Sequence, residues 1–137
     1  RVPCRRQVLI YPMTNAHDPS ASRSQFAEGF LLTRAFIDLA DASHVPAGVD
    51  RRHPEVSVAY AERIPDDLAP AIVVTAGFDP LRDEGEAYAR MLADAGVEVL
   101  LKRYPGLVHG FFNVAGVGRS QRAAVAEIAA LVRSALH

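Results

Sequence analysis

The chain has 137 residues, of which 50% are apolar and 23% are charged. These proportions are ordinary for a globular domain and exclude disorder, collagen or coiled coil as descriptions of the whole chain. With 15 basic against 16 acidic residues, the net charge is −1, which disfavours nucleic acid as a partner. The apolar runs are all shorter than the roughly 18 residues that a membrane helix needs, so we expect no membrane span.

The first residues of the chain bear on its cellular compartment and on whether it is part of a longer protein. A single cysteine, Cys4, cannot form an internal disulfide, so nothing in the sequence requires an oxidising compartment. The opening residues also lack the apolar core of a secretory signal. We therefore expect a cytoplasmic location. The chain begins with Arg1 rather than Met and reaches a strand-like run within seven residues, which favours a piece of a longer protein.

Three apolar runs predict β-strands, at residues 7–11, 71–77 and 97–104. The first is short and continuously apolar, which is typical of a strand buried on both faces. The second is rich in β-branched residues and follows Pro70, so it is the clearest of the three. In the third, one face carries Val97, Val99 and Leu101, and the other carries Glu98, Leu100 and Lys102.

Helical periodicity appears between these strands and after them, at residues 31–43, at residues 83–95 and from about residue 120. Residues 14–25 and 105–119 are predicted loops, and residues 45–67 are a connection with one short helical turn. Strands that alternate with helices indicate an α/β fold with a parallel sheet and helices on its faces.

Two titratable residues follow neighbouring strands of this sheet. Asp79 comes just after the second strand and His109 follows the third. Because functional groups gather at the carboxyl ends of parallel strands, we expect the two side chains to meet. A carboxylate there would fix the tautomer of the imidazole and stabilise its protonated form.

Other interpretations of these residues stay open. Asp79 precedes a proline and could cap a helix, although Asp83 is better placed to cap the helix at 83–95. His109 could be an ordinary loop histidine. The remaining histidines and Cys4 show no zinc-like spacing, so we expect neither a metal site nor a reactive thiol.

The predicted helix at 31–43 carries an apolar stripe that includes Leu32, Phe36 and Leu39. The simplest interpretation is that this stripe packs into the core. The alternative is that these three side chains line an apolar substrate pocket.

Two longer motifs give the chain a family resemblance. Residues 70–85 read PAIVVTAGFDPLRDEG, and residues 104–111 read YPGLVHGF. Both resemble segments of hormone-sensitive-lipase-like esterases, which are α/β-hydrolases. Residues 8–12 and 29–33 are similar to earlier segments of the same family, so the resemblance covers nearly the whole chain.

The resemblance implies specific roles. Asp79 would be the acid and His109 the general base of a Ser–His–Asp triad that cleaves carboxylic esters, with no cofactor or metal. Their separation of 30 positions agrees with the family pattern. Residues 1–137 would then be the C-terminal part of one catalytic domain: three parallel strands, their helices, and part of the cap at about residues 13–66. Leu39 departs from the tryptophan common in the family, which puts pocket details in doubt.

The family nucleophile lies in a G-x-S-x-G elbow that follows an oxyanion loop. None of the seven serines in the chain has glycine at both flanking positions, and the family places both elements before the first strand. The chain therefore resembles part of an enzyme that contains two of the three triad residues. We expect this part to be inactive alone. We expect it to pair with the missing N-terminal part or to self-associate through an open sheet edge. The alternatives are a stand-alone α/β binding module without catalysis and a degenerate hydrolase with a structural role.

Overall fold

The computed structural model describes residues 4–17 and 19–136. Its elements in chain order are β1 (Gln7–Ile10), α1 (Ala21–Gln25), α2 (Arg34–His44), the 3₁₀ turn η1 (Val58–Tyr60), β2 (Ala71–Phe78), α3 (Arg82–Asp94), β3 (Val99–Val108) and α4 (Arg119–Ala135). The predicted alternation of strands and helices is confirmed, and η1 is the short helical turn expected in the connection. In the part of the chain described, no helix is long and apolar enough to cross a membrane.

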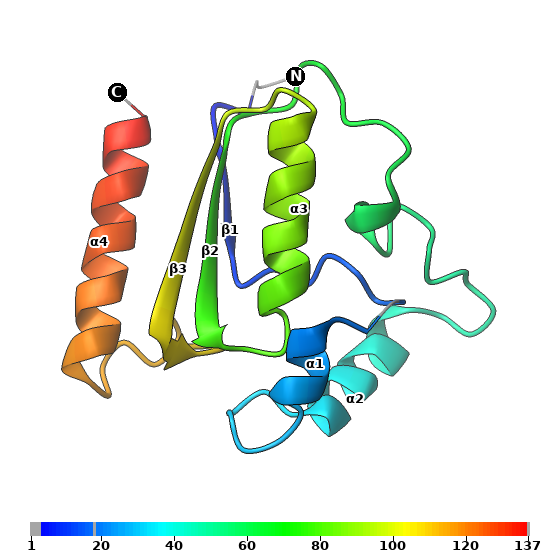
Figure 1. The fold of residues 1–137 in the computed structure, drawn as a ribbon, viewed down its shortest axis with the longest axis horizontal. Coiled ribbons are helices and arrows are strands. Elements are labelled where there is room, and N and C mark those ends of the chain that lie inside the picture. The colour runs from blue at the N-terminus through cyan, green and yellow to red at the C-terminus, as the bar shows by residue number, and fades with distance from the viewer. Residues whose placement is uncertain (1–3, 18, 137) are drawn as a thin grey trace.

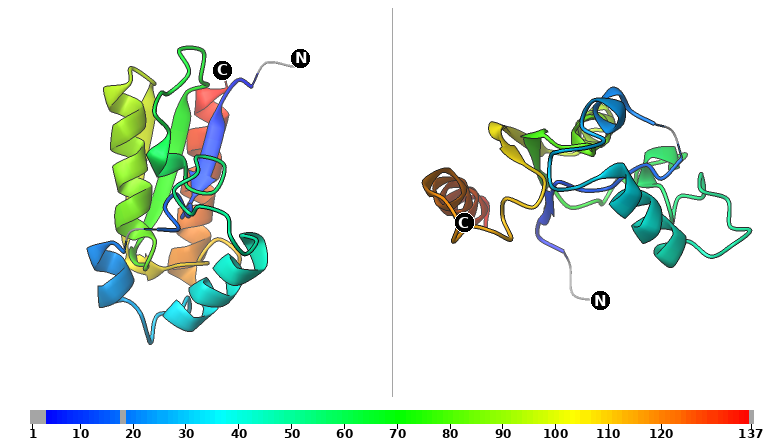
Figure 2. Two further views of the ribbon diagram at one scale, coloured as in Figure 1. Left: turned by 90° about the vertical axis from the view of Figure 1, so that its right-hand side faces the viewer. Right: turned by 90° about the horizontal axis from the view of Figure 1, so that it is seen from below.

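The three strands form one parallel sheet in the order β1-β2-β3. Helices α3 and α4 cover opposite faces of this sheet, and α1 and α2 lie beyond the carboxyl ends of the strands (Figures 1 and 2). Successive residues of the central strand β2 point to opposite faces, so that Ile72 packs with Ile128 of α4, while Val73 packs with Leu92 of α3. This alternation builds two separate cores on one strand that is buried over nearly its whole length.

The register between β2 and β3 changes near their carboxyl ends. Ala76 pairs with Tyr104, but Phe78 pairs with Val108, so β3 contains extra residues at this point. The irregularity needs a close backbone approach, because a Cβ on Gly77 would lie 2.1 Å from the carbonyl oxygen of Pro105. The expected loop from residue 105 is therefore wrong at its start, since the strand continues to Val108 through a β-bulge.

Strand β1 and the segment after it also differ from expectation. Val8 is 38% exposed, so the prediction of a strand buried on both faces is wrong for the described residues, among which β1 pairs with β2 on one side. The predicted loop at 14–25 contains the short helix α1, where the Ser20 side chain accepts a hydrogen bond from the amide of Arg23. A polar segment is helical here because Ser20 supplies the N-cap.

Helix α2 turns a different face inward from the one its apolar stripe predicted. Phe36 and Leu39 are 61% and 64% exposed, so the core interpretation is wrong for both. The helix begins at Arg34 after a Thr33 cap, and it buries Ile37 and Asp41 instead. Asp41 can face inward because its carboxylate pairs with Arg51 at 2.9 Å. The third member of the stripe, Leu32, precedes the helix and is buried against Leu81 and Ile37.

Candidate active site

The side chains of Asp79 and His109 meet at the carboxyl ends of β2 and β3. Oδ2 of Asp79 lies 3.0 Å from Nδ1 of His109, within hydrogen-bond distance. The bulge in β3 produces this contact. With an unbroken register, Phe78 would pair with Gly106 and Asp79 would lie beside Leu107, whereas the observed pairing of Phe78 with Val108 puts Asp79 beside His109.

Asp79 is fully buried and uses both carboxylate oxygens. Oδ1 accepts a hydrogen bond of 2.8 Å from the amide of Leu81, the residue that precedes α3. The N-cap of α3 is Leu81 and no side chain caps the helix, so the capping interpretation of Asp79 is wrong, whereas its pairing with His109 is observed. The prediction that Asp83 caps the helix is wrong, because α3 begins at Arg82 and Asp83 already lies in its first turn.

The contact also fixes which imidazole nitrogen carries a proton. An ionised carboxylate only accepts hydrogen bonds, so Nδ1 of His109 is the donor in this contact, and in a neutral imidazole Nε2 then carries the lone pair. Among the residues described, none hydrogen-bonds to Nε2. The His109 side chain is 21% exposed, so the imidazole is not fully enclosed by the described part of the chain. This arrangement suits a general base with an orienting acid.

The turn that carries Asp79 is held by Ser22 of α1, which is fully buried. Its hydroxyl donates to the carbonyl of Pro80 at 2.7 Å and accepts from the amide of Asp83 at 3.1 Å. In return, Asp83 accepts from the amide of Ser22 at 2.8 Å. Burial alone would raise the pKa of Asp83, but hydrogen bonds from Arg82 and Ser22 outweigh it and lower that pKa.

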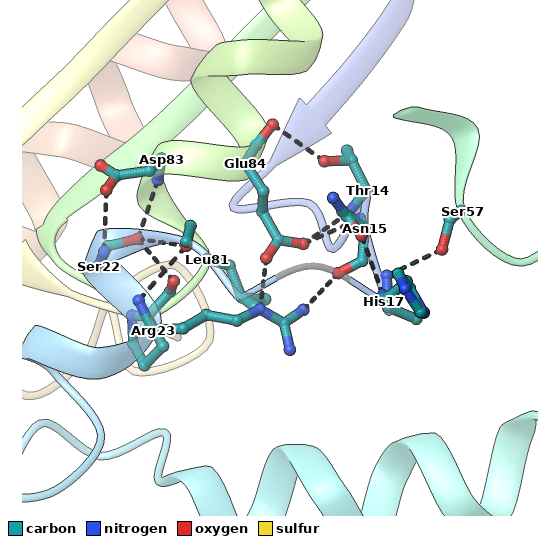
Figure 3. A network of polar contacts seen from close by, with 12 residues as sticks. Thr14, Asn15, His17, Ser22, Arg23, Ser57, Leu81, Asp83 and Glu84 are labelled. Carbon is teal, nitrogen blue, oxygen red and sulfur yellow. Dashed lines mark hydrogen bonds and ion pairs between the residues drawn. The ribbon is translucent and has the colours of Figure 1, made fainter. Parts of the chain in front are cut away.

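Glu84 makes a second connection between α3 and the segment after β1 (Figure 3). One carboxylate oxygen accepts from the amides of Thr14 and Asn15 at 2.9 and 3.1 Å. The other pairs with Nε of Arg23 at 2.6 Å, and Arg23 also donates to the carbonyl of Asn15. The charged residues of the DPLRDEG motif therefore anchor the segment between β1 and α2 to the helix that follows Asp79. Sequence reasoning missed these partners, because the burial of Glu84 that requires them is visible only in the structure.

The predicted substrate-contacting residues lie around α2, with Leu32 buried and Phe36 and Leu39 exposed. A cavity of about 210 Å³ borders the same helix, but Ile37 and Asp41 line it rather than these three residues. Contact with a substrate stays a prediction for Leu32, Phe36 and Leu39. In the described part of the chain, no group of three or more His, Cys, Asp or Glu side chains could hold a metal ion.

Comparison with known proteins identifies the family. The family described as the alpha/beta hydrolase fold matches residues 1–113. This chain belongs to the α/β-hydrolase family.

Named relatives of this α/β-hydrolase segment are ester hydrolases. It is 40% identical over 131 residues to the carboxylic ester hydrolase LipN of Mycobacterium tuberculosis, covering 95% of this chain and 35% of that protein. It is 34% identical over 113 residues to the ethyl acetate hydrolase of Pseudomonas putida, covering 82% and 35% of the two chains. The α/β-hydrolase segment thus spans about a third of the length of these relatives.

Solved structures agree with this assignment. An alpha/beta hydrolase from the metagenome of Lake Arreo, Spain, has a TM-score of 0.85 and 41% identity over 90% of this chain and 38% of that one. A fungal esterase from Rhizomucor miehei has a TM-score of 0.86 and 36% identity over 96% and 41%. The predicted resemblance and the predicted α/β-hydrolase fold class are confirmed.

Proposed function

We propose that this chain supplies the acid and the base of a carboxylic-ester hydrolase, with Asp79 and His109 in those roles. The observation that carries the proposal is the 3.0 Å contact between Asp79 Oδ2 and His109 Nδ1, combined with an Nε2 to which no described residue bonds. In such a reaction Nε2 takes the proton of a serine hydroxyl as its oxygen attacks the ester carbonyl. The resulting imidazolium returns a proton to the leaving alcohol, and Asp79 stabilises the positive charge.

The nucleophile and the oxyanion donors belong, in this proposal, to residues outside this chain segment. Two of its serines, Ser22 and Ser57, are fully buried and bonded within the fold. Residues 1–137 then form the C-terminal part of a single catalytic domain, with cap and connection elements at about 13–66. The substrate would be a small ester, with Leu32, Phe36 and Leu39 on the cap side of its pocket. The cytoplasmic location expected from the sequence remains part of the proposal.

The test uses the full-length protein that contains this segment and a short-chain p-nitrophenyl ester. We expect saturable hydrolysis, and we expect His109→Ala to reduce kcat by about 10³-fold or more, because removal of a triad member leaves only oxyanion and binding contributions. The 137-residue chain alone should not exceed background. Full activity in His109→Ala would contradict the role of His109. Turnover by the isolated chain that disappears in His109→Ala would contradict the external nucleophile.

A further inference from the structure

The imidazole of His109 has an aromatic neighbour that the sequence analysis assigned only to a strand. The rings of Tyr11 and His109 have centroids 4.4 Å apart and planes inclined by 53°. Tyr11 also contacts Phe111 edge-on at 5.6 Å, and Phe111 is fully buried. His109 is therefore bonded at Nδ1 to a carboxylate and packed against a ring that is itself supported from the core.

The backbone of Tyr11 is unusual. In the described part of the chain, the non-glycine residues with positive φ are Tyr11, at 41°, and Leu31, at 67°. A bulky residue in this region costs about 1–3 kcal/mol, and such strain clusters at functional sites. Leu31 also lies beside the histidine turn, since its Cδ2 is 3.3 Å from the position of a Cβ on Gly110. Both residues with positive φ thus lie beside the turn at His109 and Gly110.

Hydrogen bonds fix Tyr11 at both ends. Its amide donates to the carbonyl of Val74 in β2 at 2.7 Å. Its hydroxyl donates to Oδ1 of Asn113, and the amide of Asn113 closes the histidine turn on Gly110 at 2.9 Å. Burial, together with the nearby charge of Asp79, raises the pKa of Tyr11, so the hydroxyl stays protonated and able to donate at neutral pH. Tyr11 therefore connects the central strand to the turn that carries the imidazole.

We propose that Tyr11 is a positioning residue for His109. Its ring restricts the imidazole to the orientation in which Nδ1 meets Asp79, and its hydroxyl holds the turn at Asn113. Tyr11 exchanges no proton with a substrate and acts only through His109. The inference rests on the proposed function of His109 as a base, and it adds a residue that sets the orientation of that base.

The test follows the His109 Nδ1 proton by NMR in full-length protein labelled with ¹⁵N-histidine, alongside ester hydrolysis. In Tyr11→Leu we expect Nδ1–H exchange with water to accelerate about tenfold, and kcat to fall about tenfold with KM within a factor of two, because a misplaced group slows chemistry more than binding. Tyr11→Phe keeps the ring and loses the hydroxyl bond. Tyr11→Phe should match Asn113→Ala, and each should lower kcat about threefold, the effect of one hydrogen bond.

Tyr88→Leu is the matched control, because Tyr88 is a half-buried tyrosine on α3 that packs in the other core. It should lower stability without changing Nδ1–H exchange. The proposal is overturned if Tyr11→Leu behaves like Tyr88→Leu, with lower stability but unchanged exchange and kcat. If Tyr11→Leu fails to fold, Tyr11→Phe and Asn113→Ala decide, and an unchanged kcat in both overturns the proposal. If the protein hydrolyses no ester, the proposed function is wrong. The rate of Nδ1–H exchange in the variants then tests the positioning role of Tyr11 by itself.

Discussion

Asp79 and His109 leave the sheet side by side, 30 positions apart in the chain, with Oδ2 and Nδ1 separated by 3.0 Å. The pairing of Phe78 with Val108 produces this relationship, and it exists only because β3 contains a bulge. Bulges that redirect a side chain are common near active sites. The local geometry of the acid–base pair therefore depends on the backbone pairing of the residues that directly precede both side chains.

Replacement of Asp79 by asparagine tests the orienting role directly. The amide keeps the shape but can present a donor to Nδ1, which favours the wrong imidazole tautomer. We expect Asp79→Asn in the full-length protein to lower kcat by ~10⁴-fold, as in other triads. Asp66→Asn, a change at an 84% exposed carboxylate, should leave kcat unchanged. Ester-hydrolysis kinetics measure both, and a loss of less than tenfold in Asp79→Asn would remove Asp79 from the triad.

Gly77→Ala should disturb the bulge. The new Cβ would lie 2.1 Å from the backbone oxygen of Pro105, a contact that only movement of β3 can relieve. We expect a loss of about 3 kcal/mol in the free energy of unfolding, at the upper end for overpacking, and a lower kcat. Gly106→Ala is the control, since nothing lies within 4 Å of its Cβ position. Urea unfolding compares the two, and equal stabilities would show that the close approach does not matter.

The order of elements could be predicted from the sequence because hydrophobic periodicity is a local signal. The meeting of Asp79 with His109 could be predicted because functional groups gather at the carboxyl ends of parallel strands. The bulge could not, because Pro105 and Gly106 look like the start of a loop and become part of β3 only when Gly77 admits the Pro105 carbonyl. The contact of Tyr11 with His109 was missed for a similar reason. It joins residues 98 positions apart, and the positive φ of Tyr11 has no signal in the residue pattern.

The orientation of α2 was mispredicted because side-chain hydrophobicity alone decided it. Phe36 and Leu39 form the more apolar stripe, yet the buried positions are Ile37 and Asp41. The helix accepts a carboxylate inward because Arg51, ten residues later, neutralises it. This ion pair permits a carboxylate on the buried face, and apolar periodicity alone does not reveal it.

Glu84→Gln should destabilise the protein at neutral pH. The Glu84 side chain is only 3% exposed and faces Arg23, which is 16% exposed. Loss of its charge leaves a poorly hydrated guanidinium with a weaker partner, and we expect a cost of about 2–3 kcal/mol in the free energy of unfolding. Asp66→Asn at the exposed pair with Arg63 should cost no more than about 0.5 kcal/mol. Chemical denaturation of the two variants decides, and similar costs would argue against a stabilising role for Glu84.

Glu86 should make stability depend on pH. Burial opposes its ionisation, but hydrogen bonds from Arg103 and Thr75 prevail and lower the pKa of Glu86 below its ordinary value of 4.5. Because the folded-state pKa is depressed, the stabilisation is present above about pH 4.5 and is lost as the pH falls through the folded value. The difference in unfolding free energy between wild type and Glu86→Gln should therefore shrink from pH 7 to pH 3.

The partner Arg103 provides the check on this pH dependence. In an Arg103→Met background, Glu86→Gln should produce little pH-dependent difference, because the main group that favours the ionised carboxylate is gone. Urea titrations at pH 7, 5 and 3 measure the unfolding free energies of wild type, Glu86→Gln, Arg103→Met and the double variant at each pH. A constant difference between wild type and Glu86→Gln across this range would contradict the assignment.

The isolated 137-residue chain should self-associate. Strand β1 pairs with β2 on one side, and its other edge is open in the described sheet. Unpaired strand edges are templates for pairing with another chain, and Leu31, Phe36 and Leu39 add exposed apolar surface.

Replacement of Val8 in β1 by lysine should oppose edge pairing, whereas lysine in place of Val117, an 81% exposed loop residue, should not. Light scattering should show species above 14.8 kDa for wild type and Val117→Lys, and fewer for Val8→Lys. A wild-type chain that is monodisperse as a monomer and melts cooperatively would show that three strands suffice, and would favour a stand-alone module.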